Sequence, residues 1–520
     1  MAGSSLVSKP DVTLAIEGAG KPVSNEPQRV LIVAAMFSTG SATPGALTEN
    51  IPQDAASIDG LFGARSQIAL ACRNFRKVNE STPVDAIGLT ETGAAATGAF
   101  LVAGAATESG SITFVVGSAI DAAYDVVVAD LDTADAIADS IVAAINSDTR
   151  RVASATNAGS GVVTMTARQP GLHGNGIMLQ VIDGTLISGT TATVSIAMNS
   201  GSGDPISAGV FDVVADQRYQ TVIYPSESDT SILKSFLDPR FNAENDILDG
   251  VGVITLYDTF SNILAVNNAH NSQSLVTLNF PVTAEDDYRG IAMSENPIGI
   301  SAQLGAARSL RLTAGALISD LLVGQLGFDA KGGTALATRP YFNTPFPNLP
   351  IIILGRGWSS VEVQQIGLAG GSTIGSNLTR TGVIAGEMFT TYKTDAAANP
   401  DDSFNFLNKV DAAVNAREYF FNNIKKEYAQ MRLTSGSLVP GRPMTNETQI
   451  RGFLMSLYRD LSETAFVLTV AGPEAETVFA DNLIVEIDFS AGAVDVVFNR
   501  VPLVSQFREF FGTFKIAFEA

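Results

Sequence analysis

The residues able to act as nucleophile, base or metal ligand are few in this chain. Cysteine occurs once, at Cys72, and histidine twice, at His173 and His270. An internal disulfide or a Cys-based zinc cluster therefore cannot form, and imidazole acid/base chemistry has only two positions to use. A serine triad would need His270 to contact both a buried acid such as Asp258 and a serine, but no G-x-S-x-G motif presents that serine. We predict no catalytic residue, no metal site and no enzymatic activity.

Adjacent carboxylates and a glycine-rich loop are the remaining candidates for a small-molecule site. Asp286-Asp287 and Asp401-Asp402 occur in loop-like contexts, where we expect solvated turn acids. Residues 171–176 could bind an anion through backbone amides, but we interpret them as a turn, with His173 exposed or hydrogen-bonded. We assign the single Trp358 to packing or a subunit contact, and Cys72 to a small buried apolar position. No cofactor is predicted.

The composition indicates a folded, acidic protein. The 520 residues suggest about three domains, and 46% are hydrophobic while only 16% are charged. The net charge of −21 argues against binding nucleic acid over a wide surface, which needs clustered Lys and Arg. The N-terminus lacks a secretory pattern, and no apolar run approaches the roughly 20 residues that span a bilayer. We expect a protein that is soluble when made, matures in a reducing cytoplasm and does not insert into membranes.

Alternating strand and helix patterns predict a layered α/β core in two pieces, residues 28–85 and 201–400. Residues 29–37 are almost continuously apolar, which is typical of a strand covered on both faces. A helix is expected past Phe62-Gly63, up to residue 78. In the second piece, strands are expected at 219–224, 251–256 and 274–278, and helices at 228–236, 259–268 and 298–322.

Residues 86–200 differ in composition and are predicted to form an inserted α+β module. They contain ten acidic residues, three arginines and no lysine. Residues 133–145 predict a helix with acids near its start, where negative charge suits the helix dipole. Strands are expected on both sides, for example at 112–116 and 162–167.

Residues 401–504 are predicted to form a C-terminal α+β domain. Apolar residues at helical spacing indicate a long helix over about 404–433, and Asn446 can cap a second helix that ends near 462. Strands are expected at 483–489 and 494–499. The basic residues of the two helices, including Arg451 and Arg459, form either an ordinary mixed helix face or a surface that pairs with an acidic partner or neighbouring copy.

Both ends of the chain carry short segments that alternate apolar and other residues with the period of a strand. They lie in an N-terminal arm, residues 1–27, and in a C-terminal segment, residues 505–520. A lone strand leaves backbone donors and acceptors unpaired unless another sheet edge accepts it. Twenty-seven extended residues reach at most about 90 Å, enough to cross to a neighbouring copy. We therefore predict strand exchange between subunits. The apolar positions of the two segments are Val12, Leu14, Ile16, Phe514, Ile516 and Phe518.

The order of these segments resembles the contractile-phage tail sheath proteins of the Mu-like or a closely related type. The resemblance covers most of the chain. It rests on residues 29–37 after the arm, the sequence IDGLFG at 58–63, the inserted segments 133–146, 162–167 and 171–176, the long helices near 404–461 and the terminal GTFKIAF at 512–518.

This resemblance implies a structural subunit whose core is described as subtilisin-like. Such subunits polymerise as stacked hexameric rings into a helical sheath, which contracts on a baseplate signal and drives an inner tube through the host envelope. The implied partners are further copies, the tail tube protein, and baseplate and tail terminator proteins. The implied location is the phage tail of the virion, after assembly in the host cytoplasm. By the same analogy, the inserted module faces outward and the C-terminal domain faces the tube, with Arg451 and Arg459 as candidate tube contacts.

The alternative interpretation is a surface-array or adhesin-like structural protein, because acidic modules rich in Thr, Ala, Gly and Val are common in that class. Such a protein would need an export signal, and none is evident at the N-terminus. An enzyme is the third interpretation. The shape of the assembled particles separates them: striated tubes, a planar lattice or discrete particles.

Overall fold

The structure is a computed structural model, and it describes residues 28–502 except 91, 118–121, 183–186, 242–246, 282–295, 314–357, 359, 377–382, 386–387, 429, 440, 464–471 and 491. The described chain forms two compact units, divided between Glu418 and Tyr419. We call residues 28–418 the large unit and residues 419–502 the C-terminal unit. The division falls inside one continuous helix, α9 (Leu407–Tyr428).

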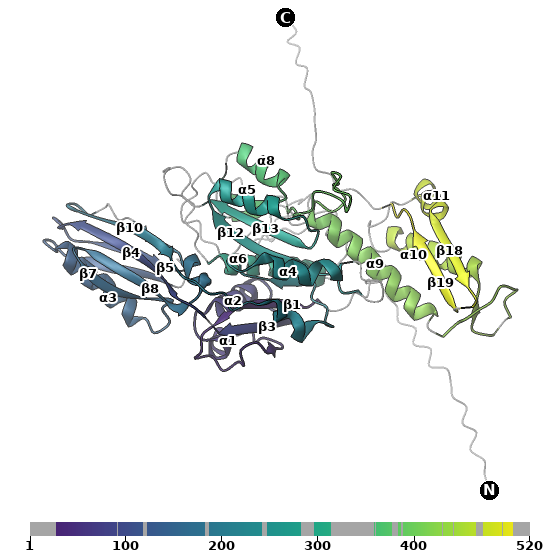
Figure 1. Ribbon diagram of the computed structural model, residues 1–520, viewed down its shortest axis with the longest axis horizontal. Coiled ribbons are helices and arrows are strands. Elements are labelled where there is room, and N and C mark those ends of the chain that lie inside the picture. The colour runs from purple at the N-terminus through teal and green to yellow at the C-terminus, as the bar shows by residue number, and fades with distance from the viewer. Residues whose placement is uncertain are drawn as a thin grey trace, which may run out of the picture. The chain divides into compact units, whose positions relative to one another are not determined.

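An eight-stranded sheet forms the centre of the large unit (Figure 1). Six neighbouring strands, β14 to β3, are parallel, and only the edge strands β15 and β2 run antiparallel to their neighbours. The predicted α/β class is therefore confirmed. In sheet order the strands are β15 (Val383–Ala385), β14 (Ser372–Ser376), β13 (Leu275–Pro281), β12 (Val251–Asp258), β11 (Thr221–Ile223), β1 (Val30–Met36), β3 (Val84–Thr90) and β2 (Leu47–Thr48).

Helices cover both faces of this sheet, which explains the apolar run of β1. Every residue of β1 is buried: Val30 and Ile32 pack in the core under one set of helices, and Leu31 and Val33 in the core under the other. The first set is α1 (Ala55–Phe62), α2 (Gln67–Val78) and α6 (Pro297–Thr313). The second is α4 (Thr230–Leu237), α5 (Phe260–Ala269) and α8 (Ser360–Leu368), with the short turns η2 (Ala208–Val214) and η3 (Asp238–Arg240).

Two of the predicted helices of the large unit have different limits. The helical segment before residue 78 consists of two helices, because α1 ends at Phe62 and Gly63 adopts φ +83°. A Cβ at Gly63 would lie 2.6 Å from the Phe37 side chain, so both the conformation and the space require glycine. Ser66 then caps α2 by accepting a hydrogen bond from the Ala69 amide. Helix α6 covers the first part of the predicted 298–322 helix, and the rest lies outside the described residues.

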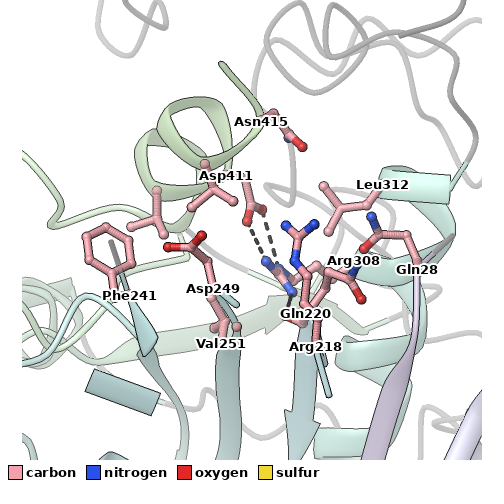
Figure 2. Close-up of a pocket in the computed structure, with 13 residues that line it drawn as sticks. Gln28, Arg218, Gln220, Phe241, Asp249, Val251, Arg308, Leu312, Asp411 and Asn415 are labelled. Atoms are coloured by element: carbon pink, nitrogen blue, oxygen red, sulfur yellow. Dashed lines mark hydrogen bonds and ion pairs between the residues drawn. The ribbon is translucent and has the colours of Figure 1, made fainter. Parts of the chain in front are cut away.

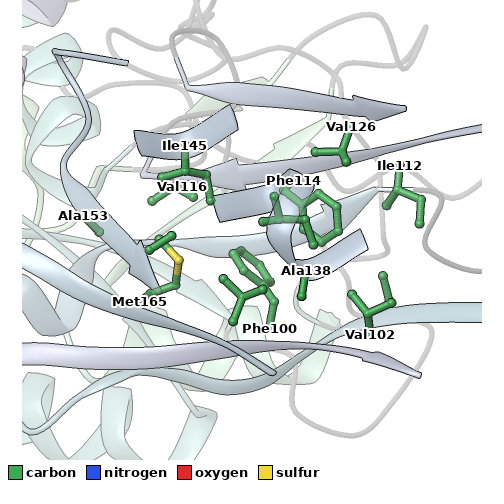
Figure 3. Packing of buried hydrophobic residues seen from close by; sticks show 14 of the residues in the cluster. Phe100, Val102, Ile112, Phe114, Val116, Val126, Ala138, Ile145, Ala153 and Met165 are labelled. Carbon is green, nitrogen blue, oxygen red and sulfur yellow. The ribbon is translucent and has the colours of Figure 1, made fainter. Parts of the chain in front are cut away.

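The inserted segment has its own two sheets and its own apolar core within the large unit. Helix α3 (Ala134–Ser147) begins where the sequence predicts, because the Thr133 side chain accepts a hydrogen bond from the Ala136 amide. Figure 3 shows the core, where Phe100 and Phe114 meet edge to face at 5.2 Å. One sheet is β10 (Thr190–Asn199), β4 (Ala95–Gly104), β8 (Val162–Pro170) and β7 (Ala153–Gly159); the other is β6 (Ala123–Val128), β5 (Gly110–Val116) and β9 (Leu179–Ile182), and η1 (Leu172–Gly176) is a short turn.

In the C-terminal unit, the second half of α9, two further helices and a hairpin pack around an aromatic cluster. Phe479 stacks on Tyr458 at 4.4 Å between ring centroids, and Phe420 and Phe498 complete the cluster. Helix α9 ends at Tyr428, earlier than the predicted residue 433, and Arg432 and Leu433 belong to a strand instead. The further elements are β16 (Arg432–Leu433), β17 (Met444–Thr445), α10 (Glu447–Glu463), α11 (Pro473–Asp481), β18 (Leu483–Asp488) and β19 (Ala493–Phe498).

Removing an aromatic ring from the core of the inserted segment should destabilise that segment strongly. We expect Phe114→Ala to lower its free energy of unfolding by about 3–5 kcal/mol, because the lost burial adds to the cost of a cavity beside Phe100. Val127 on the neighbouring strand β6 is 76% exposed, so Val127→Ala should cost under about 0.5 kcal/mol. Urea denaturation of both variants measures the difference, and equal midpoints would contradict the packing described here.

Candidate assembly interface

The side chains that could take part in catalysis or metal binding lie apart from one another, and each has a role in packing. Cys72 is buried in α2, and burial raises the pKa of its thiol to about 12, which keeps it protonated and unreactive. His173 is buried in the turn η1 rather than exposed, and burial lowers its pKa to about 4. His270 follows α5, and its pKa is also lowered, chiefly by burial. Within the described part of the chain, no group of three or more His, Cys, Asp or Glu could hold a metal ion.

The other candidates from the sequence also have structural roles. The Asp401 carboxylate accepts hydrogen bonds from Tyr392 and Ser403, and the Asp402 side chain is 87% exposed, as expected of turn acids. Trp358 is buried and donates its Nε1 proton to the Asn279 carbonyl at 3.1 Å, which assigns it to packing. Asp286 and Asp287 lie outside the described residues. Among the helices that the structure describes, none combines the length and the apolar character needed to cross a membrane.

Three arginine–carboxylate pairs attach the first half of α9 to the rest of the large unit. Asp411 of α9 lies 2.5 Å from Arg308 of α6, and Glu418 lies 3.0 Å from Arg218. In the third pair α9 supplies the arginine: Arg417 lies 2.8 Å from Asp249. Asp411 and Glu418 are seven residues apart, so two helical turns bring them to one face. Figure 2 shows Asp411 pointing down from the helix onto the Arg308 guanidinium.

Two of the three pairs that define this clamp are almost completely withdrawn from water, whereas the Arg417 side chain of the third is 27% exposed. The exposed fractions are 5% and 3% for the Arg308 and Asp411 side chains, and 7% and 1% for Arg218 and Glu418. Arg308 also donates to the Thr221 hydroxyl at 2.6 Å and to the Gln220 carbonyl, which ties α9 to the start of β11. A buried pair adds little net stability over apolar packing, but one member left alone is costly. The clamp therefore fixes which turn of α9 meets the sheet.

The two arginines predicted to contact a tube have intramolecular partners in the C-terminal unit. Arg451 of α10 donates to the Leu483 carbonyl at 2.8 Å and to the Ala480 carbonyl, and so ties the end of α11 to the start of β18. Arg459 pairs with Glu476 of α11 at 2.6 Å, and its side chain is 54% exposed. Arg451 thus has a structural role within the unit, whereas Arg459 keeps a large accessible surface. Tube contact by either arginine stays a prediction.

The hairpin of β18 and β19 is a two-stranded sheet in the described part of the C-terminal unit. Its inner face is buried or half-buried and includes Leu483, Val485 and Phe498. Its outer face carries Ile484 and Val497, which are 41% and 46% exposed. In an antiparallel pair every second residue directs its N–H and C=O away from the partner strand, so the long edges of this hairpin can each receive a further strand.

The six predicted strand-exchange positions lie outside the described residues. They are Val12, Leu14, Ile16, Phe514, Ile516 and Phe518. The exchange therefore stays a prediction, but the hairpin offers a type of surface that the sequence did not single out. Its signal in the sequence is the pair of neighbouring strands expected at 483–489 and 494–499, whose apolar residues alternate with polar ones.

Comparison with known proteins gives one curated relative along almost the whole chain. The sequence is 24% identical over 501 residues to the Mu-like prophage FluMu tail sheath protein of Haemophilus influenzae, covering 94% of this chain and 93% of the relative. This chain is thus similar along almost its whole length to a tail sheath protein. The resemblance drawn from the sequence is thereby confirmed. No protein-family model matches this chain.

Solved structures that are similar to this chain include tail sheath proteins. The sheath tail protein of Desulfitobacterium hafniense is 12% identical with a TM-score of 0.44, covering 91% of this chain and 93% of that one. The sheath tail protein of Listeria innocua is 13% identical with a TM-score of 0.46 and covers 94% of each chain. A sheath complex of an extracellular contractile injection system, in the contracted state, is 9% identical with a TM-score of 0.44 and covers 98% of each.

Breaking the clamp from one side should be far more costly than breaking an exposed pair on the same segment. We expect Asp411→Asn to lower the free energy of unfolding by about 3–5 kcal/mol, because it leaves the buried Arg308 guanidinium without its counter-charge. The matched control is Asp402→Asn, which removes the 3.6 Å pair with Lys409 and should cost under about 1 kcal/mol. Urea denaturation checks both, and similar midpoints for the two variants would refute the clamp.

The buried His173 should make stability fall as the pH falls. The unfolded chain binds a proton on this histidine near pH 6.5, whereas the folded chain does so only near pH 4, so protons favour unfolding between these values. From pH 7 to pH 5 the contribution amounts to about 2 kcal/mol. A His173→Gln variant should lose less stability than the unchanged chain over this interval, as measured by urea denaturation at both pH values. Parallel losses in the two proteins would show that His173 is not held neutral.

Proposed function

We propose that the chain is a structural subunit of a contractile tail sheath, which polymerises around an inner tube and contracts to drive the tube through a host envelope. The observation that carries this proposal is the end-to-end similarity to a Mu-like prophage tail sheath protein. A short shared motif could be borrowed by many proteins, but similarity over 94% of the chain includes the core, the inserted segment and the C-terminal unit. The surroundings of Cys72, His173 and His270 are consistent with a subunit that performs no catalysis.

Exchange of terminal strands between copies is the assembly mechanism that we propose. The arms carry alternating apolar residues, and the hairpin of β18 and β19 has two long edges that a further strand can join. Main-chain hydrogen bonds would supply affinity, and the half-buried inner face of the hairpin, with Val494, Val496 and Phe498, would receive the apolar side chains of the added strand.

The remaining parts of the proposal follow from the same relationship. The partners are further copies in stacked hexameric rings, the tail tube protein, and baseplate and terminator proteins, and the particle is a phage tail assembled in the host cytoplasm. The inserted segment would face outward, and α10 would face the tube.

Of the two arginines, Arg459 is the better candidate for tube contact because more than half of its side chain is exposed. Contraction would convert a metastable packing into one with more buried area between subunits, so that no nucleotide is needed.

Removal of the N-terminal arm tests the assembly mechanism. We expect a chain without residues 1–20 to fold but not to polymerise, because its neighbours lose the strand that links them. Negative-stain micrographs should show striated tubes for the full chain and discrete particles for the deletion. The circular dichroism spectrum of the deletion should still be that of a folded protein, because residues 28–502 are unchanged.

A substitution series controls for the length of the arm. The triple change Val12→Ser, Leu14→Ser and Ile16→Ser should also abolish tubes, whereas Thr13→Ser with Ala15→Ser, on the opposite side of the same strand pattern, should not. Normal tubes from the deletion would reject the arm mechanism. A planar lattice from the full chain would favour a surface-array protein instead.

A further inference from the structure

A small cavity lies where the inserted segment meets the eight-stranded sheet and its helices within the large unit. Phe37, Gln67 and Leu70 contribute to its wall from one side, and Val152 and His173 of the inserted segment from the other. Its volume of about 20 Å³ exceeds the roughly 10–15 Å³ that one buried water needs, but is far below the about 300 Å³ of pockets that bind organic ligands. The cavity can therefore hold a ligand of the size of one water.

Gln67, the first residue of α2, brings a buried hydrogen-bond donor to this cavity. The residue is 5% exposed, and its Oε1 accepts a hydrogen bond from the Ala35 amide at 3.2 Å. Because the Ala35 N–H can only donate, the side-chain amide must direct its oxygen to β1, which leaves Nε2 as its other end. Among the described residues, Nε2 has no hydrogen-bond acceptor. A buried donor that stays unpaired is costly, so this group calls for a partner.

His173 brings a second buried polar group to the same cavity from the turn η1. It is 8% exposed, and neither ring nitrogen makes a hydrogen bond of good geometry to a described residue. The Gln169 carbonyl lies close enough to raise the pKa of the ring slightly, but burial outweighs it and lowers this pKa to about 4. At neutral pH the ring is therefore uncharged, with one nitrogen that donates and one that accepts.

The charges at the wall of the cavity favour a neutral ligand. Arg65 also lines the cavity, and its guanidinium already pairs with Asp148 at 2.5 Å. An anion would add a second negative charge beside this one guanidinium, and a buried charge without a counter-charge is costly. A water can accept from Gln67 and donate to His173, and Asn296 on the wall can supply a third polar contact. Water is therefore the ligand that fits the size, the charge and the hydrogen-bonding groups.

We propose that one ordered water binds in this cavity, accepts a hydrogen bond from Nε2 of Gln67 and donates one to the ring of His173. The water joins α2 to η1 and is a structural part of the attachment of the inserted segment. It acts beside a direct bond at the same junction, which Gln169 Nε2 donates to the Met36 carbonyl at 2.8 Å. A water that bridges two buried groups is nearly as favourable as a direct hydrogen bond between them.

A double-mutant cycle in the full chain tests the bridge. Gln67→Leu and His173→Leu should each lower the folding equilibrium constant about tenfold or more, because each removes one partner of the water. The double variant should be about tenfold more stable than the product of the two losses predicts, because both side chains share one bridge. The Ala35 amide loses its acceptor in both Gln67 variants, so this loss cancels from the cycle.

Urea denaturation measures the four proteins of the cycle, and circular dichroism verifies that each variant folds. The matched control replaces Gln67→Leu by Gln364→Leu, a change at an exposed glutamine of α8, which should show no coupling with His173→Leu. Simple multiplication of the two losses in the Gln67 cycle, as in the control, would overturn the proposal.

A cavity-filling substitution distinguishes a bound water from direct packing between the two side chains. Val152→Ile adds a methylene group at the wall of the cavity. In the unchanged chain it should destabilise, because it displaces a water whose hydrogen bonds an alkyl group cannot replace. In the double variant, where the cavity has lost both polar groups, the same change should stabilise by filling an apolar space. Destabilisation of both proteins would contradict the bound water.

Two measurements on the unchanged chain complete the test. A density map that resolves ordered waters elsewhere in the protein should show one between Gln67 and His173, and a map without it would reject the proposal. Exchange of chloride for gluconate should shift the urea midpoints of the unchanged chain and of Gln67→Leu equally. A larger loss in the unchanged chain would assign the cavity to an anion instead of water.

Discussion

The C-terminal hairpin has more backbone hydrogen-bonding capacity than its two strands can use between themselves. Each strand of an antiparallel pair directs alternate N–H and C=O groups away from its partner, and an isolated hairpin is at best marginally stable in water. Here the inner face is held by Leu483, Val485 and the aromatic cluster around Phe479. The stability of the hairpin therefore comes from its face rather than from pairing along its edges.

Helix α9 is attached differently along its length. Its first half contacts the sheet of the large unit through the buried pairs of Asp411, Arg417 and Glu418, while Phe420 packs in the aromatic cluster of the C-terminal unit. No glycine or proline interrupts the helix between residues 407 and 428, so neither of the commonest causes of a kink is present. An ion pair joins two particular side chains, whereas apolar contacts can be exchanged for one another. The ion pairs in the first half of α9 therefore set the register of this helix.

The elements that could be predicted from the sequence are those whose pattern is local. The continuous apolar run predicted β1, and an apolar face with acids near its start predicted the helix over residues 133–145, which is α3. The long strands β4 and β10 were not predicted, because residues such as Ala95, Ala96 and Ala99 give no clear alternation. The burial of His173 depends on packing around η1 that no short segment specifies. The clamp was not predicted either, because Arg218 and Arg308 are more than 100 residues from their partners on α9.

The net charge of −21 restricts the kind of contact that could hold copies of this chain together. Copies of such a subunit repel one another, and a large, purely ionic interface between identical acidic surfaces would add to that repulsion. Main-chain hydrogen bonds and burial of apolar side chains depend little on net charge, so strand addition suits an acidic subunit better than broad charge pairing. Within that mode, a few basic residues at chosen positions can have a large effect on specificity, because most of the surrounding charge is negative.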